Sequence, residues 1–67
     1  MKYQYNFEYH NEDGLCERNS STTYTSVREA KEALIKAAYG LDLHEWWIWS
    51  GEENEEICVD HGRDCIN

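Results

Sequence analysis

The chain has 67 residues, 14 of them acidic and six basic, so its formal net charge is −8. This length predicts one domain over residues 1–67, too small to enclose the deep pocket that most enzymes use, so no catalysis and no cofactor are expected. The sequence has no apolar run long enough to cross a membrane, and its first residues lack the apolar core of a signal peptide. We therefore expect a cytoplasmic protein that does not bind membranes.

Residues 2–10 alternate between aromatic and polar side chains and predict a half-buried β-strand. The aromatic residues that share one face are Tyr3, Tyr5, Phe7 and Tyr9. The turn residues at 11–14, which end in Asp13-Gly14, predict a hairpin. A second strand is then expected over about 15–25, with an irregular or looped stretch at 17–21, where there is little to bury.

A helix is predicted after Ser26, which begins a capping box with Glu29. Apolar residues then recur at helical spacing and form one stripe. These residues are Val27, Ala30, Leu34, Ala37, Ala38 and Leu41. Gly40 can adopt the left-handed conformation that often ends a helix. Because the stripe is rich in alanine, the helix is expected to lie close to a sheet.

Residues 45–50 contain four large apolar residues in succession, and residues 55–61 alternate between apolar and polar side chains. The two segments flank a polar turn and predict a second hairpin. The chain order is therefore ββαββ. The simplest way to bury these elements is a two-layer α+β fold, in which one helix packs on one face of an antiparallel four-stranded sheet. The tail over 62–67 is short and is expected to fray.

The four large apolar residues at 46–49 cannot all face one helix, because successive side chains of a strand point to opposite faces. We expect Trp47 and Trp49 to face the helix, since burying two tryptophans removes the most apolar surface from water. Trp46 and Ile48 would then stand on the open face, exposed or covered by a partner, by the tail or by a second copy of the chain.

The acidic residues are concentrated toward the end of the chain. Residues 41–67 contain eight acids and one base, whereas residues 1–40 have a net charge of −1. Such a field attracts a basic protein and repels nucleic acid and anionic lipid. Direct binding of nucleic acid is therefore not expected, although the sheet is rich in aromatic residues. The simplest alternative is that the charge only keeps the protein soluble.

Metal ligation is not expected. The alternative ligand set contains three cysteines and one histidine: Cys16, Cys58, His61 and Cys65. Its spacing is not that of a paired zinc site. A disulfide between Cys58 and Cys65, or from Cys16 to either, would leave one cysteine over, and reduced thiols are expected in the cytoplasm. His10 and His44 are interpreted as polar surface residues near strand ends.

The chain is a small, acidic domain without proline, and it combines an aromatic strand, a capped helix over 26–39 and an acidic hairpin over 45–60. In this overall character it resembles small phage-encoded inhibitors of the anti-CRISPR and anti-restriction type. The resemblance implies a protein of the host-cell cytoplasm that inhibits a CRISPR effector or another nuclease, in some cases by imitating DNA.

These observations together predict a non-catalytic inhibitor that docks an acidic face onto a basic, nucleic-acid-binding surface of a protein partner. Tyr24 is a further candidate anchor. The expected contact residues are Glu45, Trp46, Glu52, Glu53, Glu55, Glu56 and Asp60. The alternative function is a homodimeric accessory or structural domain, in which a second copy covers the exposed aromatic strand.

Overall fold

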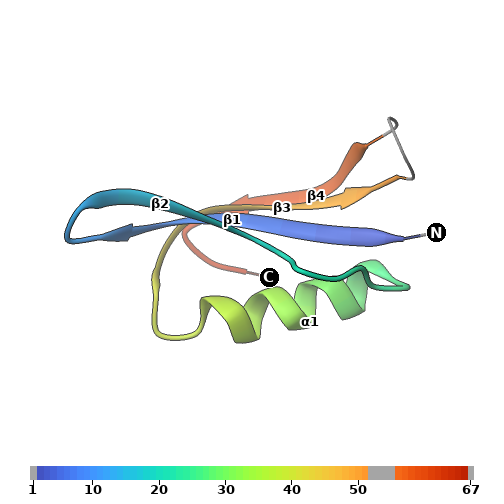
Figure 1. Ribbon diagram of the computed structural model, residues 1–67, viewed down its shortest axis with the longest axis horizontal. Helices are drawn as coiled ribbons and strands as arrows, with labels where there is room; N and C mark the ends of the chain where they lie inside the picture. The colour runs from blue at the N-terminus through green and yellow to red at the C-terminus, as the bar shows by residue number, and fades with distance from the viewer. Residues whose placement is uncertain (1, 52–55, 67) are drawn as a thin grey trace.

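The computed structural model describes residues 2–51 and 56–66, and in it one helix lies against one face of a four-stranded antiparallel sheet (Figure 1). The elements are, in chain order, β1 (Tyr3–Asn11), β2 (Gly14–Asn19), α1 (Val27–Ala38), β3 (Asp42–Ser50) and β4 (Ile57–Arg63). The strands lie in the order β2-β1-β3-β4. The predicted α+β fold with the order ββαββ is confirmed.

The aromatic face of β1 packs toward α1, as its alternation predicts. Phe7 is fully buried, and the three tyrosines of this strand are partly buried against the core. Tyr24 joins the aromatic row because its backbone exchanges two hydrogen bonds with Tyr3, of 2.9 and 2.8 Å. Between β2 and this bridge the chain leaves the sheet at 20–23, so the irregular stretch lies slightly later than predicted.

The predicted helix cap forms with one change in its partners. Ser26 Oγ accepts a hydrogen bond of 3.1 Å from the backbone N–H of Glu29. The Glu29 carboxylate accepts from the backbone N–H and the hydroxyl of Thr25, one residue before the cap. The helix stripe then buries Ala30 and Leu34 completely, and Gly40 has a left-handed φ of +80° just after the helix.

The predicted orientation of the tryptophans is wrong. Trp46 pairs with Phe7 across β1 and β3, and it is 1% exposed and faces α1. The physical reason is a β-bulge: Glu8 pairs with Glu45 but Tyr9 pairs with Leu43, so the residue between them is extra and the alternation shifts by one. Leu43 faces α1 before the bulge, and after the bulge Trp46 and Ile48 face it.

The site of Trp46 also satisfies its indole N–H, as a buried tryptophan requires. Its Nε1 donates a hydrogen bond of 2.8 Å to the backbone carbonyl of Cys65. Gly62 lies opposite Trp46 on β4 and leaves room for the ring, since a Cβ added there would be 2.7 Å from three ring atoms.

Residues 64–66 contact the rest of the fold on the same side as Trp46. The backbone N–H of Asp64 donates to the carbonyl of His44 over 3.0 Å, and Ile66 packs against the core. In Figure 1 the tail turns under the sheet toward α1, so it covers part of the same face as the helix.

Gly62→Ala is expected to lower the free energy of unfolding by about 1–3 kcal/mol, the usual cost of overpacking a core. Urea unfolding followed by tryptophan fluorescence measures it. In a Trp46→Phe background, where the ring is smaller, the same substitution should cost less. An equal cost in both backgrounds would show that the glycine does not serve the indole.

A second prediction concerns Tyr5 and alkaline pH. Burial raises the pKa of the Tyr5 phenol above its ordinary value of 10.0, and the neighbouring Tyr24 raises it further. The neutral phenol is thus favoured in the folded state, so its contribution is complete below pH 10.0 and is lost as the pH rises through the folded pKa. Tyr5→Phe should therefore reduce the loss of stability above pH 10.0, measured by denaturant unfolding.

The matched control for Tyr5→Phe is Tyr39→Phe, because the side chain of Tyr39 is 87% exposed. The control should keep the alkaline dependence of the unaltered protein. If Tyr5→Phe and the unaltered protein lose stability in parallel above the ordinary tyrosine pKa, Tyr5 is not the group responsible.

Candidate functional site

The face of the sheet opposite α1 has no helix packed on it in the described part of the chain (Figure 1). We call this surface the open face. The register places on it Gln4, Asn6, Glu8, His10, Leu15, Glu17, Asn19, Asp42, Glu45, Trp47, Trp49, Cys58, His61 and Arg63. It is therefore mainly a surface of amides, carboxylates and aromatic rings, with Leu15 as its one aliphatic side chain among these residues.

Trp47 and Trp49 are the tryptophans of the open face. Both are half-buried, and they pair with Asn6 and Gln4 of β1. The indole N–H of Trp49 donates a hydrogen bond to the side-chain oxygen of Asn6, which holds this ring down over β1. Two tryptophans on an uncovered sheet are typical of an interaction surface.

A solvent-open groove runs beside Trp49 toward β2. The residues that line it are Gln4, Tyr5, Asn6, Asn19, Ser20, Trp49 and Glu56. Its walls combine an indole ring, amide oxygens and the carboxylate of Glu56. An arginine or lysine side chain fits this chemistry, because the ring face attracts a cation and the oxygens accept its hydrogen bonds.

Three glutamates lie side by side across the open face. Glu17 of β2 pairs with Glu8 of β1, which pairs with Glu45 of β3. The row ends at Arg63 of β4, whose Nε lies 3.7 Å from Glu45 Oε2 and whose side chain is 76% exposed. Like charges directly opposite one another in a sheet are destabilising, so this arrangement favours a cation.

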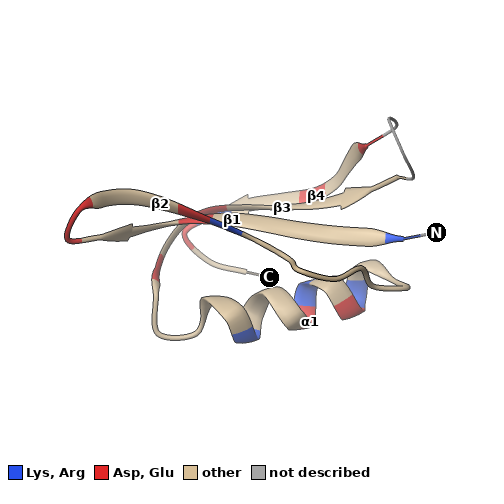
Figure 2. Ribbon diagram, in the orientation of Figure 1, with Lys and Arg blue, Asp and Glu red and all other residues tan. Residues whose placement is uncertain are grey.

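Half of the basic residues lie away from the glutamate row, on the helix side of the molecule. Three of the six bases of the chain lie on α1, on the other side of the molecule (Figure 2). Two of them pair with acids there: Arg28 with Glu32 along the helix, and Lys31 with Asp60 of β4 over 2.7 Å. The open face thus keeps a negative charge that the helix side does not balance locally.

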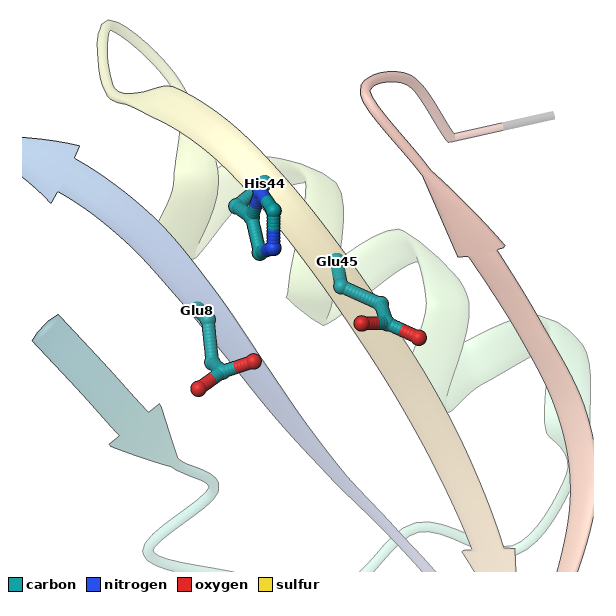
Figure 3. Close-up of side chains that lie close together, drawn as sticks. All are labelled: Glu8, His44 and Glu45. Carbon is teal, nitrogen blue, oxygen red and sulfur yellow. The ribbon is translucent and has the colours of Figure 1, made fainter. Parts of the chain in front are cut away.

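His44 lies beside two acids of the row. One ligand atom from each of Glu8, His44 and Glu45 lies within 4.8 Å of the others, and all three side chains are half-buried (Figure 3). His44 is the extra residue of the bulge in β3, and its Nδ1 lies 3.1 Å from Nε2 of His10. Sequence patterning missed this cluster because alternation does not reveal a bulge.

The predicted acidic contact residues separate in the structure. Glu45 lies on the open face and Glu56 lines the groove. Asp60 pairs with Ile48 on the helix side and binds Lys31, so it is not part of the open face. The remaining three, Glu52, Glu53 and Glu55, lie outside the described residues.

The two predicted aromatic anchors are not on the open face. Trp46 is buried, which contradicts its assignment as an exposed contact residue. Tyr24 is partly buried against the core, with its ring stacked 6.1 Å from that of Tyr5. Trp47 and Trp49 lie on the surface where Trp46 was predicted.

The alternative zinc set is not brought together. Cys16 lies on β2 and Cys58 on β4, at opposite edges of the sheet, and neither forms a disulfide. Within residues 2–51 and 56–66, the one group of three or more side chains close enough to hold a metal ion is Glu8, His44 and Glu45. The cysteine set is therefore wrong as a metal site.

Comparison with known proteins gives no relative: no protein family, no curated protein and no solved structure matches the chain. The one helix of the described chain, α1, falls short of the length and apolar content needed to cross a bilayer. Function must therefore be argued from the open face itself.

The glutamate row leads to a stability prediction. Glu8→Gln removes the central charge and should raise the free energy of unfolding by about 0.2–1 kcal/mol at low salt, because it relieves repulsion from both neighbours. Urea unfolding at low and high salt measures this gain, which should shrink as salt screens the charges.

The control for the glutamate row is Glu12→Gln, in the exposed β1–β2 turn. It changes the net charge equally and should have a smaller effect. A loss of stability in Glu8→Gln, or a gain that salt does not reduce, would contradict repulsion within the row.

Proposed function

We propose that this protein is a non-catalytic inhibitor that docks its open face onto a basic, nucleic-acid-binding surface of a protein partner. The observation that supports this most is the uncovered face itself, on which Trp47 and Trp49 stand beside a row of three glutamates. A CRISPR effector or another nuclease is the class of partner that the resemblance to phage inhibitors suggests.

The two kinds of side chain serve different steps of docking. The acidic row steers a basic surface toward the open face and pairs with its arginines and lysines. The tryptophans then supply contact area, and the Trp49 ring is already held in place by Asn6. The groove beside Trp49 accepts one basic side chain of the partner, with Glu56 as its counter-charge.

The finer proposal is that the acids imitate the phosphates of DNA. Neighbouring strands lie about 4.8 Å apart, so the three carboxylates form a regular row on a rigid support. A surface that binds nucleic acid is built to receive such a row of negative charge. Competition with duplex DNA distinguishes this from contact at another basic surface.

The second candidate function is a homodimeric accessory domain. It is favoured by the exposure of apolar side chains on the edge strand β4, where Ile57 is 66% and Val59 44% exposed. Sedimentation at micromolar concentration tests this candidate. A protein that stays monomeric excludes the homodimeric function.

The docking proposal is tested by capture of proteins from a host-cell lysate on three immobilised forms: the unaltered chain, Trp49→Ala and Tyr39→Ala. A protein bound through the open face should be retained by the unaltered chain and by Tyr39→Ala, since Tyr39 is exposed at the end of α1. Trp49→Ala should weaken binding by about 30-fold, as expected for an interface hot spot.

Two further measurements make the test specific. The retained protein should be released by duplex DNA and by high salt, and Glu45→Gln should shift its release to lower salt. Retention that is equal in Trp49→Ala, or indifferent to both DNA and salt, would overturn the proposal.

A further inference from the structure

We propose that Glu8, His44 and Glu45 form a binding site for one zinc ion on the open face, with His10 as the residue that orients His44. This site goes beyond the docking function and does not depend on it. The three donors come from two neighbouring strands, β1 and β3, so the sheet fixes their spacing (Figure 3).

The donor atoms are close enough for one ion. Zinc lies about 2.1 Å from nitrogen and oxygen ligands, so donors around a tetrahedral ion are about 3.4 Å apart. The separations here are within 4.8 Å, and the two glutamate side chains can rotate about their own bonds to reach the shorter spacing. The open face leaves the outer side accessible, so water completes the coordination.

The bulge in β3 gives His44 its position. In a regular strand the residue before Glu45 would point to the opposite face of the sheet. Because His44 is extra in the pairing with β1, its imidazole lies beside Glu8 and Glu45 instead. Bulges commonly redirect a side chain in this way next to functional sites.

His10 supplies the second contact that a metal-binding histidine usually has. Its Nε2 lies 3.1 Å from Nδ1 of His44. The two rings meet edge to face, with their centroids 4.8 Å apart. With Nδ1 of His44 as the donor in this bond, its Nε2 carries the lone pair that binds a metal. In Figure 3 a ring nitrogen of His44 points toward the two carboxylates.

The charge around the cluster also favours a cation. Glu8 lies between Glu17 and Glu45 in the register, and the nearby base, Arg63, is largely exposed. A divalent ion between Glu8 and Glu45 removes the repulsion that the sheet imposes on them. This is the opposite of the cysteine-based site, whose members the sheet keeps apart.

The mixture of donors selects the metal. Magnesium and calcium prefer oxygen ligands, whereas an imidazole with two carboxylates suits zinc and its neighbours in the transition series. We therefore expect zinc to bind at least about tenfold more tightly than magnesium, with one ion per chain.

Calorimetric titration of the whole chain with zinc chloride, in buffer without chelator, tests the site. The expected result is one saturable site, weakened at least about tenfold by His44→Gln and by Glu8→Gln. His10→Ala should weaken it by about tenfold through loss of orientation. Circular dichroism checks that each variant is folded. If His44→Gln is unfolded, Glu8→Gln takes its place as the variant that tests the site.

Two variants separate the site from general attraction of zinc to an acidic surface. His61→Gln removes an imidazole of the open face outside the cluster and should leave the affinity unchanged. Arg63→Gln removes the cation beside Glu45 and should strengthen binding, up to about threefold. A tighter variant is a result that structural damage does not produce.

Cobalt titration identifies the ligands directly. Cobalt bound by nitrogen and oxygen shows only weak visible bands, whereas cobalt bound by thiolate adds a strong charge-transfer band in the near ultraviolet. The proposal is overturned by that charge-transfer band, by the lack of a saturable zinc site, or by equal affinity in His44→Gln and His61→Gln. Because no partner is present in these measurements, their outcome is independent of the docking proposal.

Discussion

The burial of Trp46 is the contact on which the rest of the structure depends. Its ring packs with Phe7 in a core that α1 covers, over the space left by Gly62, and its N–H is satisfied by the carbonyl of Cys65. This one side chain therefore joins β1, the helix layer, β4 and the tail. In a chain too short for a large core, such a shared contact replaces several smaller ones.

Burying Trp46 also decides what the other face presents. Because neighbours on a strand alternate, the same choice leaves Trp47 and Trp49 on the side without a helix, beside the glutamate row. The chain balances this with amides: Asn6 binds the Trp49 indole, and Gln4 and Asn19 flank it. These polar side chains let the open face stand in water although it carries two tryptophans.

The fold was predictable from the sequence because its elements have strong local patterns. The aromatic alternation of β1 and the cap at Ser26 each define an element without reference to the rest of the chain. The facing of β3 was not predictable, because it depends on a bulge that joins two alternating segments of opposite phase. The tryptophan area within 46–49 gives no sign of this bulge, which lets both Leu43 and Trp46 face the helix.

The candidate site was predictable only in its chemistry. Acidic groups with tryptophans were recognised, but the residues that meet come from strands far apart in sequence, as Glu8 and Glu45 do. His44, the extra residue of the bulge, is the member of the site that alternation could least predict. If His44 were deleted, Leu43, Trp46 and Ile48 would alternate regularly and still face α1, at the cost of one backbone bond to Asp64. His44 is thus equivalent to a single-residue insertion that leaves the core unchanged, the kind of change through which a surface acquires new chemistry while its fold is preserved.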